Sequence, residues 1–212
     1  MGKVSLVIDT VKMIVDKGTT VLEAALRNNI YIPHLCYHPD SEPRGVCRLC
    51  TVAVGDGQLI SACRTPVEPG MVVNTRSPEV DRAVRPVVEL LIADHHASCR
   101  GCTASGHCEL QKIMSYLRID RKRVRRLRLS EELPLDSANF CFDYAPNKCV
   151  LCGICVQTCE NIHGVSSLYF IGRGYGTRIG FFGDMVRCES CRECVARCPV
   201  SALLPKNTAP NL

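Results

Sequence analysis

The sequence has no tryptophan, and only 5% of its 212 residues are aromatic. Large aromatic rings fill much of a big core, so their scarcity suits several small cores better than one large one. Apolar residues still make up 46% of the chain, which is enough to bury real cores. The composition therefore favours a chain of small domains.

Long hydrophobic runs are also missing. No segment approaches the roughly 20 apolar residues that a membrane-spanning helix needs. The first residues, MGKVSLVID, hold neither an apolar stretch long enough for a secretory signal nor a small-residue cleavage site. We therefore expect a cytoplasmic protein with no membrane span, whose cysteines stay reduced.

The motifs of substrate chemistry are absent as well. The sequence contains no Rossmann fingerprint, no P-loop, no obvious flavin site and no Ser/His/Asp arrangement. Gly172, Gly174 and Gly176 lack both the G-x-G-x-x-G spacing and a strand–loop–helix context, so we expect them to form the turn of a hairpin. The chain is thus predicted to have no catalytic residues and no substrate-converting site of its own.

What the sequence has in abundance is cysteine, with 16 residues. In a reducing compartment such a count indicates metal binding rather than disulfides. Fifteen of the cysteines, together with one histidine, fall into four consecutive sets. The exception is Cys141, which we expect to be a small buried apolar side chain.

The first set has the spacing C-x10-C-x2-C-x12-C and consists of Cys36, Cys47, Cys50 and Cys63. A two-iron cluster needs four thiolates, and its plant-type pattern also combines a C-x2-C pair with a remote fourth cysteine. Gly45 leaves room for the backbone to approach the cluster. The sequence predicts a [2Fe–2S] site here, with structural zinc as the alternative.

The second set, H-x3-C-x2-C-x5-C, consists of His95, Cys99, Cys102 and Cys108. Three cysteines would leave one iron of a [4Fe–4S] cluster open, and the histidine could fill that position. One histidine and three cysteines also suit zinc, and His96 stands next to His95, so spacing leaves both metals open.

The third and fourth sets each have the bacterial ferredoxin spacing C-x2-C-x2-C-x3-C, repeated with an offset of 39 residues. In such pairs the fourth cysteine of each run binds the other cluster. The sequence therefore predicts two [4Fe–4S] sites with exchanged ligands. They are Cys149, Cys152, Cys155 and Cys198 for one site, and Cys188, Cys191, Cys194 and Cys159 for the other.

Local patterns indicate the elements that carry these sets. Residues 4–8 alternate between apolar and polar side chains and 11–15 form a second apolar run, so a β-hairpin is expected. Thr20 and Glu23 have the spacing of a capping box before an amphipathic helix. Further strands are expected at 51–54 and 71–73, which would complete a β-grasp domain.

Residues 79–94 predict a helix that ends at His95, although Pro86 should kink or break it because proline lacks an N–H. Another short helix is expected at 109–118.

The predicted fold class is α+β with three domains: a [2Fe–2S] β-grasp domain at 1–78, a small helical His-ligated [4Fe–4S] domain at 79–137, and a ferredoxin-like domain with two [4Fe–4S] clusters at 138–212.

The formal charge of +5 is weak evidence for a nucleic-acid partner. Cluster-bound cysteines are thiolates, and counting the clusters brings the chain to about −2. The basic run 118–128 alternates with apolar residues, which favours a solvated or subunit-docking face over a nucleic-acid patch.

The four sets, in this order, resemble the electron-transfer region shared by the large iron–sulfur subunit of complex I and the N-terminal part of [FeFe] hydrogenases. The same region occurs as a separate subunit in the diaphorase module of NAD-linked [NiFe] hydrogenases. The segment 106–111, GHCELQ, is similar to the family's G-x-C-x-L-Q, and His95 matches its histidine ligand. The resemblance, which covers residues 1 to about 205, thus implies a cubane at the second set. Pro86 and Glu160 are small departures from the family pattern.

The doubled ferredoxin run is more like the hydrogenase members of the family, and the chain stops soon after Cys198 without the motifs of a hydrogen-activating centre. The resemblance therefore implies a diaphorase-type electron-transfer subunit with one [2Fe–2S] and three [4Fe–4S] clusters. The implied partners are a flavin/NAD(H)-binding diaphorase subunit, a further iron–sulfur subunit and the hydrogenase small and large subunits.

Other functions stay open from the sequence. Electron-bifurcating hydrogenases and NAD-dependent formate dehydrogenases use similar modules. A free multi-cluster ferredoxin-like carrier would need the same ligand sets, and a zinc-stabilised nucleic-acid-binding protein is a remote alternative.

Overall fold

The computed structural model describes residues 2–95, 99–120, 124, 132–183, 188 and 191–206. It divides into two compact units. One comprises Met1–Leu90 with Ile113–Ile119, and the other comprises Leu91–Lys112 with Asp120–Leu212. The domain boundaries expected at residues 78 and 137 stay predictions.

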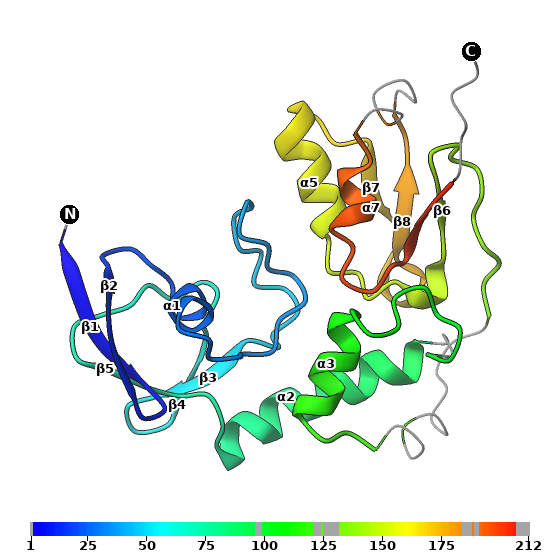
Figure 1. Ribbon diagram of the computed structural model, residues 1–212. Coiled ribbons are helices and arrows are strands. Elements are labelled where there is room, and N and C mark those ends of the chain that lie inside the picture. Colours follow the sequence, from blue (N-terminus) through cyan, green and yellow to red (C-terminus); the bar gives the residue numbers. More distant parts are fainter. Residues whose placement is uncertain are drawn as a thin grey trace. The chain divides into compact units, whose positions relative to one another are not determined.

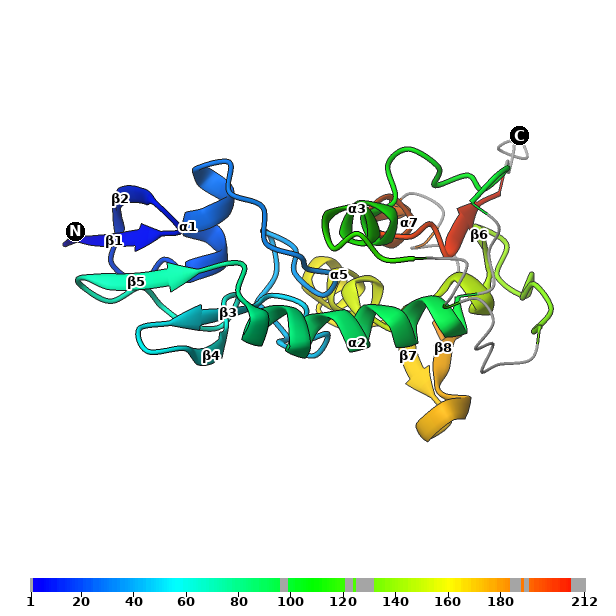
Figure 2. The same ribbon diagram turned by 90° about the horizontal axis from the view of Figure 1, so that it is seen from below.

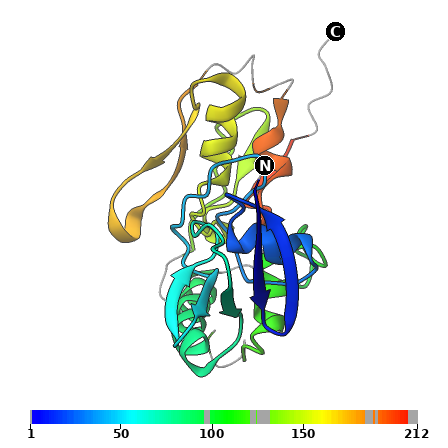
Figure 3. The same ribbon diagram turned by 90° about the vertical axis from the view of Figure 1, so that its left-hand side faces the viewer.

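The first unit contains a mixed five-stranded sheet (Figures 1 and 3). Its strands are β1 (Lys3–Ile8), β2 (Val11–Asp16), β3 (Thr51–Val54), β4 (Gln58–Ser61) and β5 (Met71–Asn74), in the spatial order β2-β1-β5-β3-β4. The neighbouring strands β1 and β5 are parallel, and the other neighbouring pairs are antiparallel. Strand β4 was not expected from the sequence.

Helix α1 (Val21–Arg27) packs its apolar face on the core of this sheet. The predicted capping box is confirmed: Glu23 donates its backbone N–H to Thr20 Oγ1 at 3.3 Å, and Thr20 donates its own to Glu23 Oε2 at 3.0 Å. Both bonds satisfy donors that the first helical turn would otherwise leave unpaired. A mixed sheet wrapped around one helix is the expected β-grasp fold.

Helix α2 (Pro78–Asp94) is a single helix that contains Pro86, as Figure 2 shows in green. The prediction that Pro86 would break the helix is therefore wrong, and a kink at Pro86 stays a prediction. Proline removes one N–H from the hydrogen-bond ladder, but Val80, Val84, Val88 and Ile92 form a continuous buried stripe at helical spacing. Packing of that stripe outweighs the loss of one bond. The second expected helix is confirmed as α3 (Glu109–Tyr116).

The described residues of the ferredoxin-like part of the second unit form two small sheets and two helices. Strands β6 (Phe142–Tyr144) and β9 (Leu203–Pro205) pair antiparallel, as do β7 (Leu168–Ile171) and β8 (Arg178–Phe181). The helices are α5 (Ile154–His163) and α7 (Glu193–Ala196), and the 3-10 turns are η2 (Pro146–Lys148) and η3 (Gly174–Gly176). The hairpin expected at Gly172–Gly176 is thus confirmed, and the fold class is α+β.

Within the described residues, no helix has the length and apolar character needed to cross a membrane.

Candidate iron–sulfur sites

The first cysteine set lies in the loops that flank β3 and β4. Cys36, Cys50 and Cys63 are almost fully buried, and Cys47 is partly buried. Cys47 donates its backbone N–H to Cys36 Sγ at 3.5 Å. The thiols interact in two pairs, Cys36 with Cys47 and Cys50 with Cys63. The structure therefore brings all four predicted residues together.

Backbone amides surround one sulfur of this set. A hydrogen bond from the Cys47 thiol, with further bonds from the amides of residues 45–47, lowers the pKa of Cys36 to about 5. Gly45 has φ +68°, a left-handed conformation that glycine adopts without strain. The expected close approach of the backbone at Gly45 is thus present, and it favours the thiolate form that binds metal.

The second set spans the end of α2 and the start of α3. The His95 N–H donates to the Leu91 carbonyl at 3.0 Å, so the helical bonding of α2 extends to His95. Cys108 directly precedes α3, and its carbonyl accepts a hydrogen bond from Lys112 at 3.1 Å. Burial raises the pKa of Cys108, and the charges of Cys102 and Cys99 raise it further, so these three thiols lie near one another. Ligation by His95 stays a prediction.

The third set lines one cavity in the second unit. Cys149, Cys152, Cys155 and the distant Cys198 share its wall, together with mainly apolar residues such as Val200. Two backbone amides donate to its sulfurs: Leu151 to Cys149 Sγ at 3.4 Å, and Ala202 to Cys198 Sγ at 3.2 Å.

The fourth set lines a second cavity, and it too draws on both cysteine runs. Cys188, Cys191, Cys194 and the distant Cys159 share its wall. Ser167 donates its backbone N–H to Cys159 Sγ at 3.3 Å. Cys155 and Cys159 lie one helical turn apart on α5, yet each belongs to a different cavity. The structure therefore groups the cysteines as the exchanged-ligand prediction requires.

The chemistry of these two cavities fits a [4Fe–4S] cluster. Each offers four cysteine sulfurs in mainly apolar surroundings, and backbone N–H groups donate to the sulfurs of Cys149, Cys159 and Cys198. Burial raises the pKa of Cys194 to about 12, so binding must displace thiol protons. Among the described residues, no three or more His, Cys, Asp or Glu side chains converge on a position for a single metal ion.

Two aromatic residues on the cavity walls were not expected from the sequence. Phe142 lines the fourth-set cavity, and Tyr144 lines the third-set cavity. Their only sequence signal is the alternation Phe-Asp-Tyr just before the first ferredoxin run. Cys141 has no exposed surface and lines neither cavity, as expected for a packing residue.

Three family models match the chain in succession. A 2Fe-2S iron-sulfur cluster binding domain matches residues 2–78, and an NADH-ubiquinone oxidoreductase-G iron-sulfur binding region matches 85–123. A 4Fe-4S dicluster domain matches residues 148–202. The three kinds of cluster domain, inferred from the cysteine sets and the family resemblance, are confirmed at this level.

Curated relatives align with almost the whole chain. The NADPH-Fe(3+) oxidoreductase subunit alpha of Geobacter sulfurreducens is 34% identical over 96% of this chain and 24% of its own length. The mitochondrial NADH-ubiquinone oxidoreductase 78 kDa subunit of Neurospora crassa is 31% identical over 97% of this chain and 28% of its own length. The NADP-reducing hydrogenase subunit HndD of Solidesulfovibrio fructosivorans is 33% identical over 96% of this chain and 36% of its own length. The chain thus spans about a quarter to a third of these relatives.

A solved structure matches at full length. A chain in the crystal structure of NAD+-reducing [NiFe]-hydrogenase in the H2-reduced state superposes with a TM-score of 0.81 and 30% identity. The match covers 99% of this chain and 90% of that one. Together with the three family models that match in succession, this likeness shows that the chain belongs to the iron–sulfur subunit family of NAD-linked hydrogenases and complex I-type oxidoreductases.

Proposed function

We propose that the chain relays electrons between a flavin/NAD(H) subunit and a hydrogenase catalytic subunit. One [2Fe–2S] cluster is held by Cys36, Cys47, Cys50 and Cys63, and one [4Fe–4S] cluster by His95, Cys99, Cys102 and Cys108. Two further [4Fe–4S] clusters are held by Cys149, Cys152, Cys155 and Cys198, and by Cys188, Cys191, Cys194 and Cys159.

The observation that carries the proposal is the pair of cysteine-lined cavities that share α5. Cys155 and Cys159 are four residues apart, which corresponds to about 6 Å along a helix. Electron transfer over protein distances needs closely spaced redox centres, and one helical turn supplies a ligand to each of two. Such a pair suits a relay.

When bound, iron–sulfur clusters supply one-electron redox chemistry. The chain's own residues bind them, orient them and exclude water. Apolar side chains such as Val200 and Leu168 line the cavities, and backbone amides donate to the sulfurs of Cys149, Cys159 and Cys198. Burial and hydrogen bonding at sulfur are the means by which a protein sets a cluster's potential.

The proposed partners rest on the full-length likeness to the hydrogenase chain. They are a flavin/NAD(H)-binding diaphorase subunit, a further iron–sulfur subunit and the hydrogenase small and large subunits. The likeness covers 90% of that hydrogenase chain, whereas this chain spans 24% to 36% of the length of the curated relatives.

The test is anaerobic isolation of the native complex through a tag on this chain. We expect flavin-binding and nickel-binding subunits to co-purify, and either NADH or H2 to reduce the chain's clusters, as followed by EPR. Reduction by formate but not by H2 would assign the chain to a formate dehydrogenase instead. Elution of a monomer that carries clusters without partners would contradict the subunit proposal and support a free carrier.

A further inference from the structure

Strand β6 presents one aromatic ring to each ferredoxin-like cavity. Phe142 and Tyr144 are two residues apart, so they lie on the same face of the strand. Phe142 lines the cavity that contains Cys159, and Tyr144 lines the cavity that contains Cys149. Both rings are buried, with exposures of 3% and 5%. The two sites thus receive rings that differ by a single hydroxyl group.

The surroundings of the Tyr144 hydroxyl let its O–H group donate a hydrogen bond. The backbone N–H of Ile179 donates to Tyr144 Oη at 3.3 Å, in a buried position. Because Oη already accepts this bond, its own O–H points to a different partner. Tyr144 and Cys149 share the wall of the third-set cavity and also of a wider neighbouring cavity. The Cys149 sulfur is therefore the available acceptor.

A hydrogen bond joins the side chains of Tyr144 and Cys149. A cluster-bound cysteine is a thiolate, which has no proton to donate. The Tyr144 hydroxyl is therefore the donor of this bond, and the Cys149 sulfur is the acceptor.

We propose that Tyr144 is a positioning residue whose O–H···Sγ hydrogen bond to Cys149 raises the reduction potential of the third-set cluster. The inference rests on the proposed ligation of that cluster by Cys149, Cys152, Cys155 and Cys198. Reduction adds negative charge that spreads onto the cysteine sulfurs, so a donor at sulfur stabilises the reduced state more than the oxidised state. Phe142 supplies no such donor to the fourth-set cluster. The hydroxyl therefore biases the pair toward holding the electron at the third site.

The test replaces the hydroxyl and nothing else. In Tyr144→Phe, we expect the midpoint potential of one [4Fe–4S] cluster to shift to a lower value while the other clusters keep theirs. The full-length, cluster-loaded chain is titrated and followed by EPR, with iron and acid-labile sulfide measured on the same samples. Tyr169→Phe is the matched control, because Tyr169 is 42% exposed and lines neither cavity. It should leave every potential unchanged.

Unchanged potentials in a fully loaded Tyr144→Phe chain would overturn the inference, as would an equal shift in Tyr169→Phe. If Tyr144→Phe lost iron, replacement of Tyr144 by 3-fluorotyrosine would serve instead, because its more acidic phenol is the stronger donor. A shift to higher potential would then support the inference, and no shift would overturn it. Failure of the proposed ligation looks different, since the unaltered chain would then lack the third-set [4Fe–4S] cluster. Failure of the proposed partners would leave the cluster and its potential in place.

Discussion

Ligand type at single positions governs how each cluster responds to an added electron. His95 is the one neutral ligand among the proposed sixteen, and it replaces a negatively charged thiolate. A cluster with less surrounding negative charge accepts an electron more readily. The second-set cluster should therefore sit at a higher potential than its all-cysteine counterpart.

Replacing His95 by cysteine tests this electrostatic effect. In His95→Cys, we expect the midpoint potential of the second-set cluster to fall, because a thiolate adds negative charge beside the iron. An EPR-monitored redox titration of the loaded chain measures it, and the [2Fe–2S] potential serves as an internal reference. An unchanged midpoint potential in a fully loaded variant would contradict the electrostatic account.

The exchange of ligands between the third and fourth sets makes a second prediction for single residues. Cys198→Ala should reduce the iron content and alter the EPR signal of the cluster held by Cys149, Cys152 and Cys155, although Cys198 belongs to the other run. Cys141→Ala is the control and should retain full iron, because Cys141 lines neither cavity. Loss of iron in Cys141→Ala, or full iron content in Cys198→Ala, would show that the ligands are assigned wrongly.

Single residues differ in how far sequence reveals their role. The cysteine runs have a fixed spacing that encodes their chemistry, so the grouping of Cys159 and Cys198 could be predicted from that spacing alone. The role of Tyr144 could not. Its hydroxyl meets the backbone of Ile179, a partner 35 residues away on the hairpin, and only the folded chain brings the two together.

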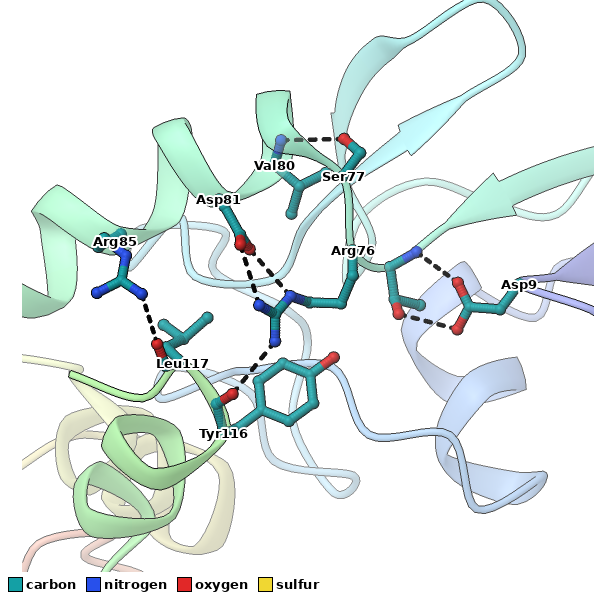
Figure 4. A network of polar contacts seen from close by, with 9 residues as sticks. Asp9, Arg76, Ser77, Val80, Asp81, Arg85, Tyr116 and Leu117 are labelled. Carbon is teal, nitrogen blue, oxygen red and sulfur yellow. Dashed lines mark hydrogen bonds and ion pairs between the residues drawn. The ribbon is translucent and has the colours of Figure 1, made fainter.

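At the scale of elements, two arginines cap the C-terminal end of α3 (Figure 4). The Tyr116 carbonyl accepts a hydrogen bond from Arg76 Nη1 at 3.2 Å, and the Leu117 carbonyl accepts one from Arg85 Nη2 at 2.7 Å. Arg76 is oriented by Asp81 through contacts of 2.9 and 3.0 Å, and its guanidinium lies 5.0 Å from the centre of the Tyr116 ring. These bonds satisfy carbonyls that a helix end leaves unpaired.

This capping predicts a loss of stability in Arg85→Ala. Removing a charged donor from a partly buried carbonyl should lower the free energy of unfolding by about 1–2 kcal/mol. Each kcal/mol lowers the midpoint of anaerobic thermal denaturation by roughly 2–4 °C for a chain of this length. Arg82→Ala is the matched control on the same helix, because Arg82 is exposed and pairs with the exposed Glu79. It should change the midpoint little. Equal effects of the two variants would contradict a capping role.

Elements with local signals were predictable, and those that depend on distant partners were not. The capping box of Thr20 and Glu23 lies within four residues, so sequence alone placed the start of α1. Strand β4 was missed because its four residues, Gln58–Ser61, show no clear alternation and gain their conformation by pairing with β3. At Pro86 the local signal predicted a break in α2 that the structure does not show. The loss of one backbone hydrogen bond is outweighed by the packing of the buried stripe of α2.

At the scale of the whole molecule, the order of the cluster modules carries the assignment. Three family models match in succession along the chain, and a chain of the NAD+-reducing [NiFe]-hydrogenase structure matches over 99% of this chain. Most of the basic run 118–128, expected as a solvated or docking face, lies outside the described residues, so that expectation stays a prediction. The cysteine sets are thus the feature that identifies the molecule.

Elemental analysis of the anaerobically purified chain tests most directly whether the cysteine sets hold iron–sulfur clusters. Iron, acid-labile sulfide and zinc are measured per chain, together with the EPR spectrum of the reduced protein. We predict a brown protein with the iron and sulfide of one [2Fe–2S] and three [4Fe–4S] clusters, and no stoichiometric zinc. A colourless chain that contains zinc and no sulfide would contradict the central claim that this is an iron–sulfur electron relay.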